Sequence, residues 1–221
     1  MPRLLELFSG TGSVGKEFDG EVVSVDIAGD EPTHRADILE WDHTIYDPHH
    51  FDMVWALPPC TQYSKARTWA RTPRDLEGAD ALVRKALDII DYFRPRFWFV
   101  ENPWGGLLRG RKVVAHLPPP KQTSYCMYGY PYQKHTAIWT NAAELELPVC
   151  NKDCAQMVLG SKGRWKHPSL AQRFNRVHEG PRYAQAYLYS MPPGLCRQIC
   201  DHVLERLERP AESGPNNLLQ E

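Results

Sequence analysis

The sequence predicts an α/β fold in which a mainly parallel sheet is covered by helices on both faces. Two observations carry this prediction: apolar runs alternate between strand-like and helix-like periods, and several strand-like runs end at Gly, Pro or Asp. A chain of 221 residues with 42% apolar and 24% charged side chains has the size and composition of one globular domain. We expect that domain to span 1–209 and a flexible tail to follow over 210–221.

Four strands are expected in the N-terminal part of the chain, over 4–8, 21–26, part of 34–39, and 52–57. The first strand leads into a Gly-rich turn and the start of a helix, and the second is rich in β-branched Val. The fourth is continuously apolar, as in a strand buried on both faces, and Pro58-Pro59 stops it.

The remaining elements follow the same alternation. Apolar residues from Ala79 to Phe93 recur on one face of an amphipathic helix, which Pro95 ends. A buried strand over 96–100 is closed by Glu101-Asn102-Pro103, and a hairpin is expected between 122–127 and 136–140. A final helix starts near Pro193, a residue suited to a first helical turn.

The charges divide unevenly along the chain although the net charge is only -1. Residues 1–60 hold 3 Lys or Arg against 12 Asp or Glu, whereas residues 61–182 hold 20 against 10. Such asymmetry is typical of a protein whose later part binds a polyanion, and equally of a charged, solvated face balanced by nearby counter-charges. Charge alone leaves both interpretations open.

The six cysteines indicate the compartment. The N-terminus meets an acid before any long apolar run, and no window approaches the roughly eighteen apolar residues of a membrane span. We therefore expect free thiols rather than disulfides. The expected location is the cytoplasm of a bacterial or virus-infected host cell, or the nucleus if the chain is eukaryotic.

The first motif is the Gly-rich turn from Phe8 to Gly15, directly after the first strand. Such a turn lets the backbone approach a ligand closely. Asp26 ends the next strand, where α/β folds place an acid on a ribose diol. The turn lacks the dinucleotide fingerprint and the phosphate-binding Gly-Lys-Ser/Thr pattern, which favours an adenosyl ligand without phosphates.

Two further motifs follow neighbouring strands of the expected sheet. Cys60 comes just after Pro58-Pro59, on a stiff loop at the position where α/β sheets bind substrates, with several Lys and Arg behind it. A rigid mount and an electropositive surrounding suit a thiolate nucleophile, although a small buried cysteine is the common alternative. Glu101 ends the next strand, so its carboxylate and the thiol can share one site.

Together these motifs resemble the cytosine-C5 DNA methyltransferase family. The resemblance rests on Leu-Phe-Ser-Gly-Thr-Gly-Ser, Val-Asp-Ile, Ala36-Asp37-Ile38, Pro-Pro-Cys-Thr-Gln-Tyr-Ser and Glu-Asn-Pro, followed by Tyr128-Gly129-Tyr130-Pro131 and Ser190-Met191-Pro192-Pro193. They cover most of residues 3–200 in the family's usual order. The resemblance implies a Rossmann-like S-adenosylmethionine-dependent methyltransferase fold and a cytosine in DNA as substrate.

The resemblance also implies roles for single residues. Asp26 would hold the ribose of S-adenosylmethionine and Asp37 the adenine amine, within a cofactor set of Phe8, Ser9, Gly10, Thr11, Gly12, Asp26, Ile27, Asp37, Ile38, Pro58 and Ser190. Cys60 would attack C6 of a flipped cytosine, and Glu101 would bond its N3 and amine. The family's Arg-x-Arg reads Lys134-His135-Thr136 here, which leaves Lys134 as the catalytic cation.

The family's target-recognition domain is reduced to a basic insert over about 141–178. We expect this insert and the nucleophile loop to contact nucleic acid through Ser64, Lys65, Arg67, Asn102, Thr136, Lys162, Arg164, Lys166 and Arg173. The compact insert leaves RNA open as the substrate in place of DNA. Departures such as Thr136 leave open a scaffold that binds nucleic acid without catalysis, and no sequence feature decides between monomer and homodimer.

Cysteines in the insert raise the question of a metal. Cys150 and Cys154 precede His167 and His178 at spacings compatible with zinc, but no fourth ligand is evident. Free cysteines are the alternative that we favour, so no metal is expected.

Overall fold

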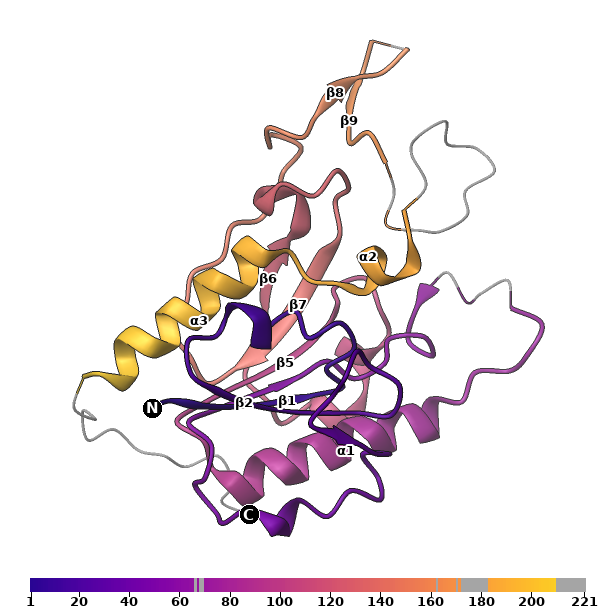
Figure 1. Ribbon diagram of the computed structural model, residues 1–221. Helices are drawn as coiled ribbons and strands as arrows, with labels where there is room; N and C mark the ends of the chain where they lie inside the picture. The colour runs from indigo at the N-terminus through magenta and orange to yellow at the C-terminus, as the bar shows by residue number, and fades with distance from the viewer. Residues whose placement is uncertain (66, 68–69, 162, 170, 172–182, 210–221) are drawn as a thin grey trace.

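A seven-stranded sheet organises the computed structural model, which describes residues 1–65, 67, 70–161, 163–169, 171 and 183–209 (Figure 1). Its order is β3-β2-β1-β4-β5-β7-β6, with β1 to β5 parallel, β7 antiparallel to β5 and β6 antiparallel to β7. The strands are β1 (Arg3–Leu7), β2 (Glu21–Asp26), β3 (His34–Arg35), β4 (Met53–Ala56), β5 (Phe97–Pro103), β6 (Lys121–Ser124) and β7 (His135–Thr140).

The strand order reverses between β1 and β4. The chain adds β2 and β3 on one side of β1, and then returns to place β4 and β5 on the other side. Leu7 pairs with Ala56, and the Leu57 amide bonds the Leu7 carbonyl at 3.1 Å, so the loops after β1 and β4 start side by side. Open α/β sheets bind ligands at such a switch point, outside the carboxyl ends of the strands.

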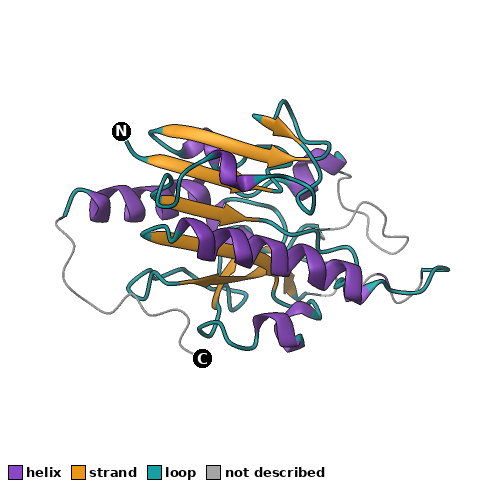
Figure 2. Cartoon of the chain, turned by 90° about the horizontal axis from the view of Figure 1, so that it is seen from below, coloured by secondary structure: helices purple, strands orange, loops and turns teal. Residues whose placement is uncertain are grey.

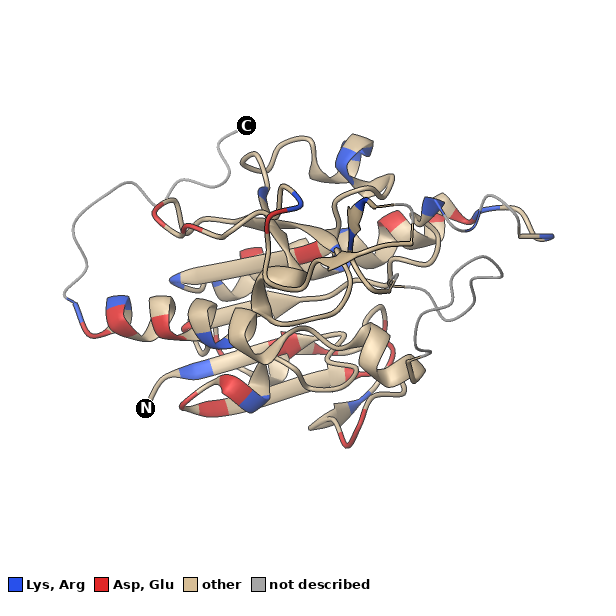
Figure 3. Ribbon diagram, turned by 90° about the horizontal axis from the view of Figure 1, so that it is seen from above, with Lys and Arg blue, Asp and Glu red and all other residues tan. Residues whose placement is uncertain are grey.

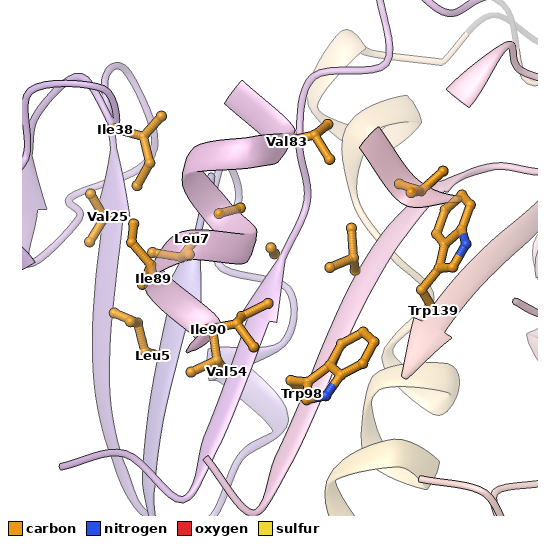
Figure 4. Close-up of a cluster of buried hydrophobic side chains, with 14 of the residues drawn as sticks. Leu5, Leu7, Val25, Ile38, Val54, Val83, Ile89, Ile90, Trp98 and Trp139 are labelled. Atoms are coloured by element: carbon orange, nitrogen blue, oxygen red, sulfur yellow. The ribbon is translucent and has the colours of Figure 1, made fainter. Parts of the chain in front are cut away.

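Helices cover both faces, as the sequence predicts. Helix α1 (Leu76–Phe93) crosses the front of the strands in Figure 2, and α3 (Pro193–Leu207) packs on the opposite face. Leu5 and Leu7 face α1, where Figure 4 shows them beside Ile89, while the alternate residue Leu4 packs on the α3 side. No described helix meets the length and apolarity needed to cross a membrane.

Most expected elements are confirmed, including the exact span of β2 and the start of α3 at Pro193. The prediction of a helix after the Gly-rich turn is wrong, because only a 3-10 helix, Gly15–Glu17, forms there. The Val14 and Gly15 amides bond the side chain of buried Glu6, each at 3.1 Å. The strand expected to close at Glu101 runs on to Pro103, because Glu101 and Asn102 pair with β7.

The insert contributes a small separate ribbon. It is formed by β8 (Val158–Leu159) and β9 (Trp165–Lys166), which pair antiparallel. In Figure 1 the ribbon projects beyond β6 and β7, away from β1 and β2. A short helix, α2 (Gln185–Tyr189), then leads the chain back to α3.

A partly buried ion pair between Asp80 of α1 and Arg111 braces the loop that follows β4. Arg111 donates two hydrogen bonds to one Asp80 oxygen, at 3.0 and 2.6 Å, and the Tyr63 hydroxyl donates to the other at 2.8 Å. Burial raises the pKa of Asp80, but the hydrogen bonds from Arg111 and Tyr63 outweigh it and hold the pKa below its usual value. The carboxylate thus ties the loop to the helix.

We predict that Asp80→Ala lowers the free energy of unfolding by about 2 to 3 kcal/mol, because it leaves the Arg111 charge and the Tyr63 hydroxyl without their partner. Urea denaturation measures the change. Arg197→Ala, which removes the more exposed pair with Glu17, is the control and should cost less than about 1 kcal/mol. Equal effects of the two substitutions would contradict the bracing role.

We also predict that Glu6 makes stability depend on pH. Burial raises its pKa from 4.5 to about 7, so between these values the folded chain keeps a proton that the unfolded chain has released. The free energy of unfolding therefore falls as pH rises through this window, by about 3 kcal/mol at most. Denaturation of Glu6→Gln between pH 5 and 8 should show a flatter profile than wild type. An unchanged slope would contradict the assignment.

Candidate active site

The turn after β1 is built from left-handed backbone. Phe8, Gly10 and Gly12 have φ of 55°, 52° and 62°, a conformation that glycine adopts without steric cost. The Ser9 amide bonds the Val25 carbonyl at 3.3 Å, which holds the turn against β2. The five residues from Phe8 to Gly12 that the sequence singles out thus form one bend at the carboxyl end of β1.

Asp26, at the end of β2, is the acid that organises this bend. Its Oδ2 accepts the Gly10 amide at 2.9 Å and its Oδ1 accepts the Ala28 amide at 2.7 Å, while the side chain stays half-buried. Gly29 closes on the bend so tightly that a Cβ there would lie 2.8 Å from the Gly10 carbonyl oxygen. The Asp26 carboxylate and the glycine backbone of the turn after β1 therefore lie side by side.

Three other residues expected at this end of the sheet differ in exposure. Ile27 is 66% exposed and offers an apolar face to a ligand. Asp37 is half-buried and accepts the Leu39 amide at 3.0 Å. The Ile38 side chain is buried in the core on the α1 face, so its backbone is the part that faces a ligand, and its place in the cofactor set stays a prediction.

The C-terminal segment returns to the Gly-rich turn. The Met191 amide donates to Ser13 Oγ at 3.1 Å, which joins positions far apart in the chain. The neighbouring Ser190 hydroxyl lies 2.8 Å from the Tyr130 hydroxyl and donates to the Tyr187 carbonyl at 2.8 Å. Ser190 therefore lies beside the turn, and its hydroxyl is engaged with protein groups.

The loop after β4 presents Cys60. The Pro58 carbonyl accepts the buried Asn102 Nδ2 at 2.9 Å, and the Cys60 carbonyl accepts the Tyr63 and Ser64 amides at 3.0 and 2.9 Å. Both sides of the thiol are thus fixed, one to β5 and the other by a tight turn. Cys60 itself is half-buried.

The surroundings of the thiol contain both other expected catalytic residues. Burial raises the pKa of Cys60, the Lys134 ammonium lowers it, and the Glu101 carboxylate raises it. Lys134 Nζ lies 3.3 Å from the Tyr125 hydroxyl and 4.4 Å from the centre of that ring. Cys60, Glu101 and Lys134 therefore share one electrostatic environment, although they come from three segments.

Glu101 is held from β7 by a residue that we expected to contact nucleic acid. The Thr136 hydroxyl donates a short hydrogen bond to Glu101 Oε1 and also lies 3.1 Å from the Asn102 carbonyl. Thr136 and Asn102 have no exposed surface, so their side chains serve the interior of the site here, and the nucleic-acid contact expected of both stays a prediction. Asn102 Oδ1 has no hydrogen-bond partner among the described residues.

The basic residues expected to contact nucleic acid lie in two places. Lys65 is exposed and Ser64 half-buried on the nucleophile loop, whereas Arg67 donates to Thr72 and Pro73 of its own loop. Exposed Arg164 and Lys166 lie on or beside the β8–β9 ribbon; Lys162 and Arg173 fall outside the described residues. Figure 3 shows Asp and Glu on the N-terminal strands, and Lys and Arg on the loop that leads into α1.

The sequence did not reveal several supporting residues. Tyr125 beside Lys134 and the Arg111–Asp80 pair beneath Tyr63 carry no local pattern that marks them. Cys126 lies with Cys150, Cys154 and His167, their ligand atoms all within 4.8 Å of one another. Pairing of β6 with β7 brings Cys126 there, and no sequence spacing shows it.

Known proteins resemble the chain in sequence and in fold. No protein-family model matches the chain. A protein of Frog virus 3 (isolate Goorha) named "Probable DNA (cytosine-5)-methyltransferase" is 34% identical over 218 residues, covering 90% of this chain and 99% of the viral protein.

Two solved structures match part of the chain. The match to the methyltransferase EhMeth of Entamoeba histolytica covers 67% of this chain and 56% of the EhMeth chain, with a TM-score of 0.50 and 14% identity. The Dnmt2 methyltransferase of S. pombe matches 63% and 50%, with a TM-score of 0.45 and 17% identity. The matched part spans about half the length of these two proteins. The fold is that of Rossmann-like methyltransferases, and the identity to the viral protein over nearly its whole length shows that the chain belongs to the DNA (cytosine-5)-methyltransferase family.

Proposed function

We propose that the chain transfers a methyl group from S-adenosylmethionine to C5 of cytosine in DNA. One observation carries the proposal: Cys60, on the loop after β4, feels the charges of Glu101 on β5 and of Lys134 just before β7, and this loop starts beside the Gly-rich turn. The name of the viral relative, at 34% identity, supports the same reaction. A scaffold without catalysis has no need to combine these three groups with the bend at Asp26.

The residues at the ends of β1 and β2 fit S-adenosylmethionine. The half-buried Asp26 carboxylate has lone pairs left to accept hydrogen bonds from a ribose diol, and exposed Ile27 suits the face of an adenine. The glycines at 10 and 12 keep side chains away from the bend. Asp37 would receive the adenine amine, and the Pro58 and Ser190 segments would border the methionine end. The cofactor supplies an electrophilic methyl group on sulfur.

Cys60 performs the covalent step. Its thiolate adds to C6 of the cytosine, and the electron pair released toward N3 makes C5 nucleophilic. Glu101 holds a proton at N3 and accepts a hydrogen bond from the exocyclic amine, which stabilises the developing charge. After C5 gains the methyl group, solvent water takes the C5 proton. The electron pair of that bond re-forms the C5–C6 double bond as the sulfur–C6 bond breaks, which returns Cys60 to the thiolate.

Lys134 and Thr136 position these two groups. Partial burial of the thiol disfavours the thiolate, and the nearby Lys134 ammonium offsets part of that penalty. The Thr136 hydroxyl fixes one oxygen of Glu101 and thereby sets the orientation of the carboxyl group toward the base. We assign Thr136 to positioning the carboxylate, the role left to it by its complete burial.

DNA would reach this site with the target cytosine flipped out of the stack. The nucleophile loop offers Ser64, Lys65 and Arg67, and the β8–β9 ribbon offers Arg164 and Lys166 for phosphate contacts. We propose that the segment 141–178 is a compact target-recognition region. The expected Lys162 and Arg173 belong to that segment but lie outside the described residues.

We predict that Cys60→Ala lowers the rate of methyl transfer at least about a thousandfold, because it removes the thiolate that forms the C6 adduct. Transfer of a labelled methyl group to duplex DNA, single-stranded DNA and RNA measures the rate and compares the three substrates. Cys200→Ala, a buried cysteine on α3, is the control and should keep the wild-type rate. Full activity of Cys60→Ala would contradict the mechanism, and a preference for RNA would contradict the assigned substrate.

We predict that Lys134 sets the pH dependence of the reaction. Because burial raises the pKa of Cys60, kcat/KM should increase with pH until the thiol has ionised. Lys134→Gln removes a cation that lowers this pKa, so the profile should move to higher pH by about one unit. Lys134→Arg should restore the wild-type position. A uniform loss of rate in Lys134→Gln without a shift would contradict this role.

A further inference from the structure

We propose that Cys126, Cys150, Cys154 and His167 bind a structural Zn²⁺ ion. Each of these residues offers one ligand atom, and all four atoms lie within 4.8 Å of one another. His167 Nε2 is 3.3 Å from Cys154 Sγ and 3.6 Å from Cys150 Sγ. The three cysteines are buried, and His167 is half-buried. This proposal does not depend on the proposed methyl transfer.

The distances agree with tetrahedral zinc. With Zn–S near about 2.3 Å and Zn–N near about 2.0 to 2.1 Å, tetrahedral angles place sulfur and nitrogen about 3.6 Å apart and two sulfurs about 3.8 Å apart. The two sulfur–nitrogen distances lie within about 0.3 Å of this value. Three thiolates and one imidazole complete the four-coordinate set of a structural site, so no position remains for water or substrate.

The backbone around Cys150 is shaped for a thiolate. Lys152 takes a left-handed conformation, with φ of 68°, and its amide points to Cys150 Sγ at 3.3 Å. A side chain that is not glycine rarely adopts this conformation without a reason. The Cys150 amide donates to Ser124 Oγ at 2.9 Å, and Gln133 Nε2 donates to the Cys150 carbonyl at 2.9 Å. These bonds fix the ligand from the surrounding strands.

The position of the four ligands shows what the ion would hold. Cys126 lies in the 3-10 helix between β6 and β7, Cys154 precedes β8, and His167 directly follows β9. The ion would therefore join both ends of the β8–β9 ribbon to the main sheet (Figure 1). Leu159 and Trp165 of the ribbon are 62% and 63% exposed, and Met157 is the partly buried apolar residue packed against the three cysteines.

The two-stranded β8–β9 ribbon is too small to be stable without a cross-link such as a metal ion. An isolated pair of strands is at best marginally stable in water, and this pair has exposed apolar side chains. Small segments that cannot form a hydrophobic core commonly gain stability from a structural metal. The alternatives for this cluster are free thiols and a disulfide between two of the three cysteines.

The experiment measures metal in the full-length chain purified under reducing conditions. Elemental analysis after gel filtration should find one zinc per chain, and replacement by Co²⁺ should give the visible absorption of a tetrahedral thiolate site. A wild-type chain that retains no metal after incubation with zinc overturns the proposal. Iron in place of zinc, or a disulfide within the cluster detected by mass spectrometry, overturns it as well.

Substitutions identify the ligands. Cys126→Ala, Cys150→Ala and His167→Ala should each lower the zinc retained by about tenfold or more, whereas Cys154→His keeps a ligand atom and should retain it. Cys200→Ala lies outside the cluster, on α3, and should retain one zinc per chain. Ligand variants that bind zinc as tightly as Cys200→Ala overturn the assignment.

Discussion

The reversal of strand order between β1 and β4 is the constraint on which the site depends. Because of it, the parallel strands β1 and β4 are neighbours and their carboxyl ends lie side by side, with Leu7 opposite Ala56. The loop after one strand forms the bend at Asp26, and the loop after the other presents Cys60. Cofactor and nucleophile regions thus become neighbours through backbone pairing alone, before any side chain contributes specificity.

Buried polar groups then hold the reacting side chains in place. Glu6 fixes the amides that follow the Gly-rich turn, Asn102 fixes the Pro58 carbonyl, and Thr136 fixes Glu101. Burying such groups costs stability unless they are paired, and here each holds at least one well-placed partner. The same low-polarity surroundings that raise the pKa of Cys60 strengthen the influence of Lys134 on it. Burial of the site therefore both holds the reacting side chains in place and tunes the reactivity of the Cys60 thiol.

The sequence alone predicts the fold well because the core elements follow simple periodicities. The alternation of Leu4 and Leu5 between the two faces and the apolar face of α1 are local patterns. Asp26, Cys60 and Glu101 could be predicted because each lies at or just after the end of a strand and matches a motif of the family. The buried role of Thr136 and the approach of Cys126 to His167 depend on pairing across β5, β7 and β6, which no local pattern encodes. The bonds from the Val14 and Gly15 amides to Glu6 are likewise absent from any local pattern.

The most direct test is to trap the covalent adduct. Duplex DNA with fluorine at C5 of its cytosines allows the thiolate to add at C6 and the methyl group to transfer, but C5 then has no proton to lose, so the sulfur–C6 bond persists. With S-adenosylmethionine present, mass spectrometry of the digested complex should find cytosine joined to Cys60. No adduct, or one on another cysteine, would contradict the assignment of Cys60 as the nucleophile.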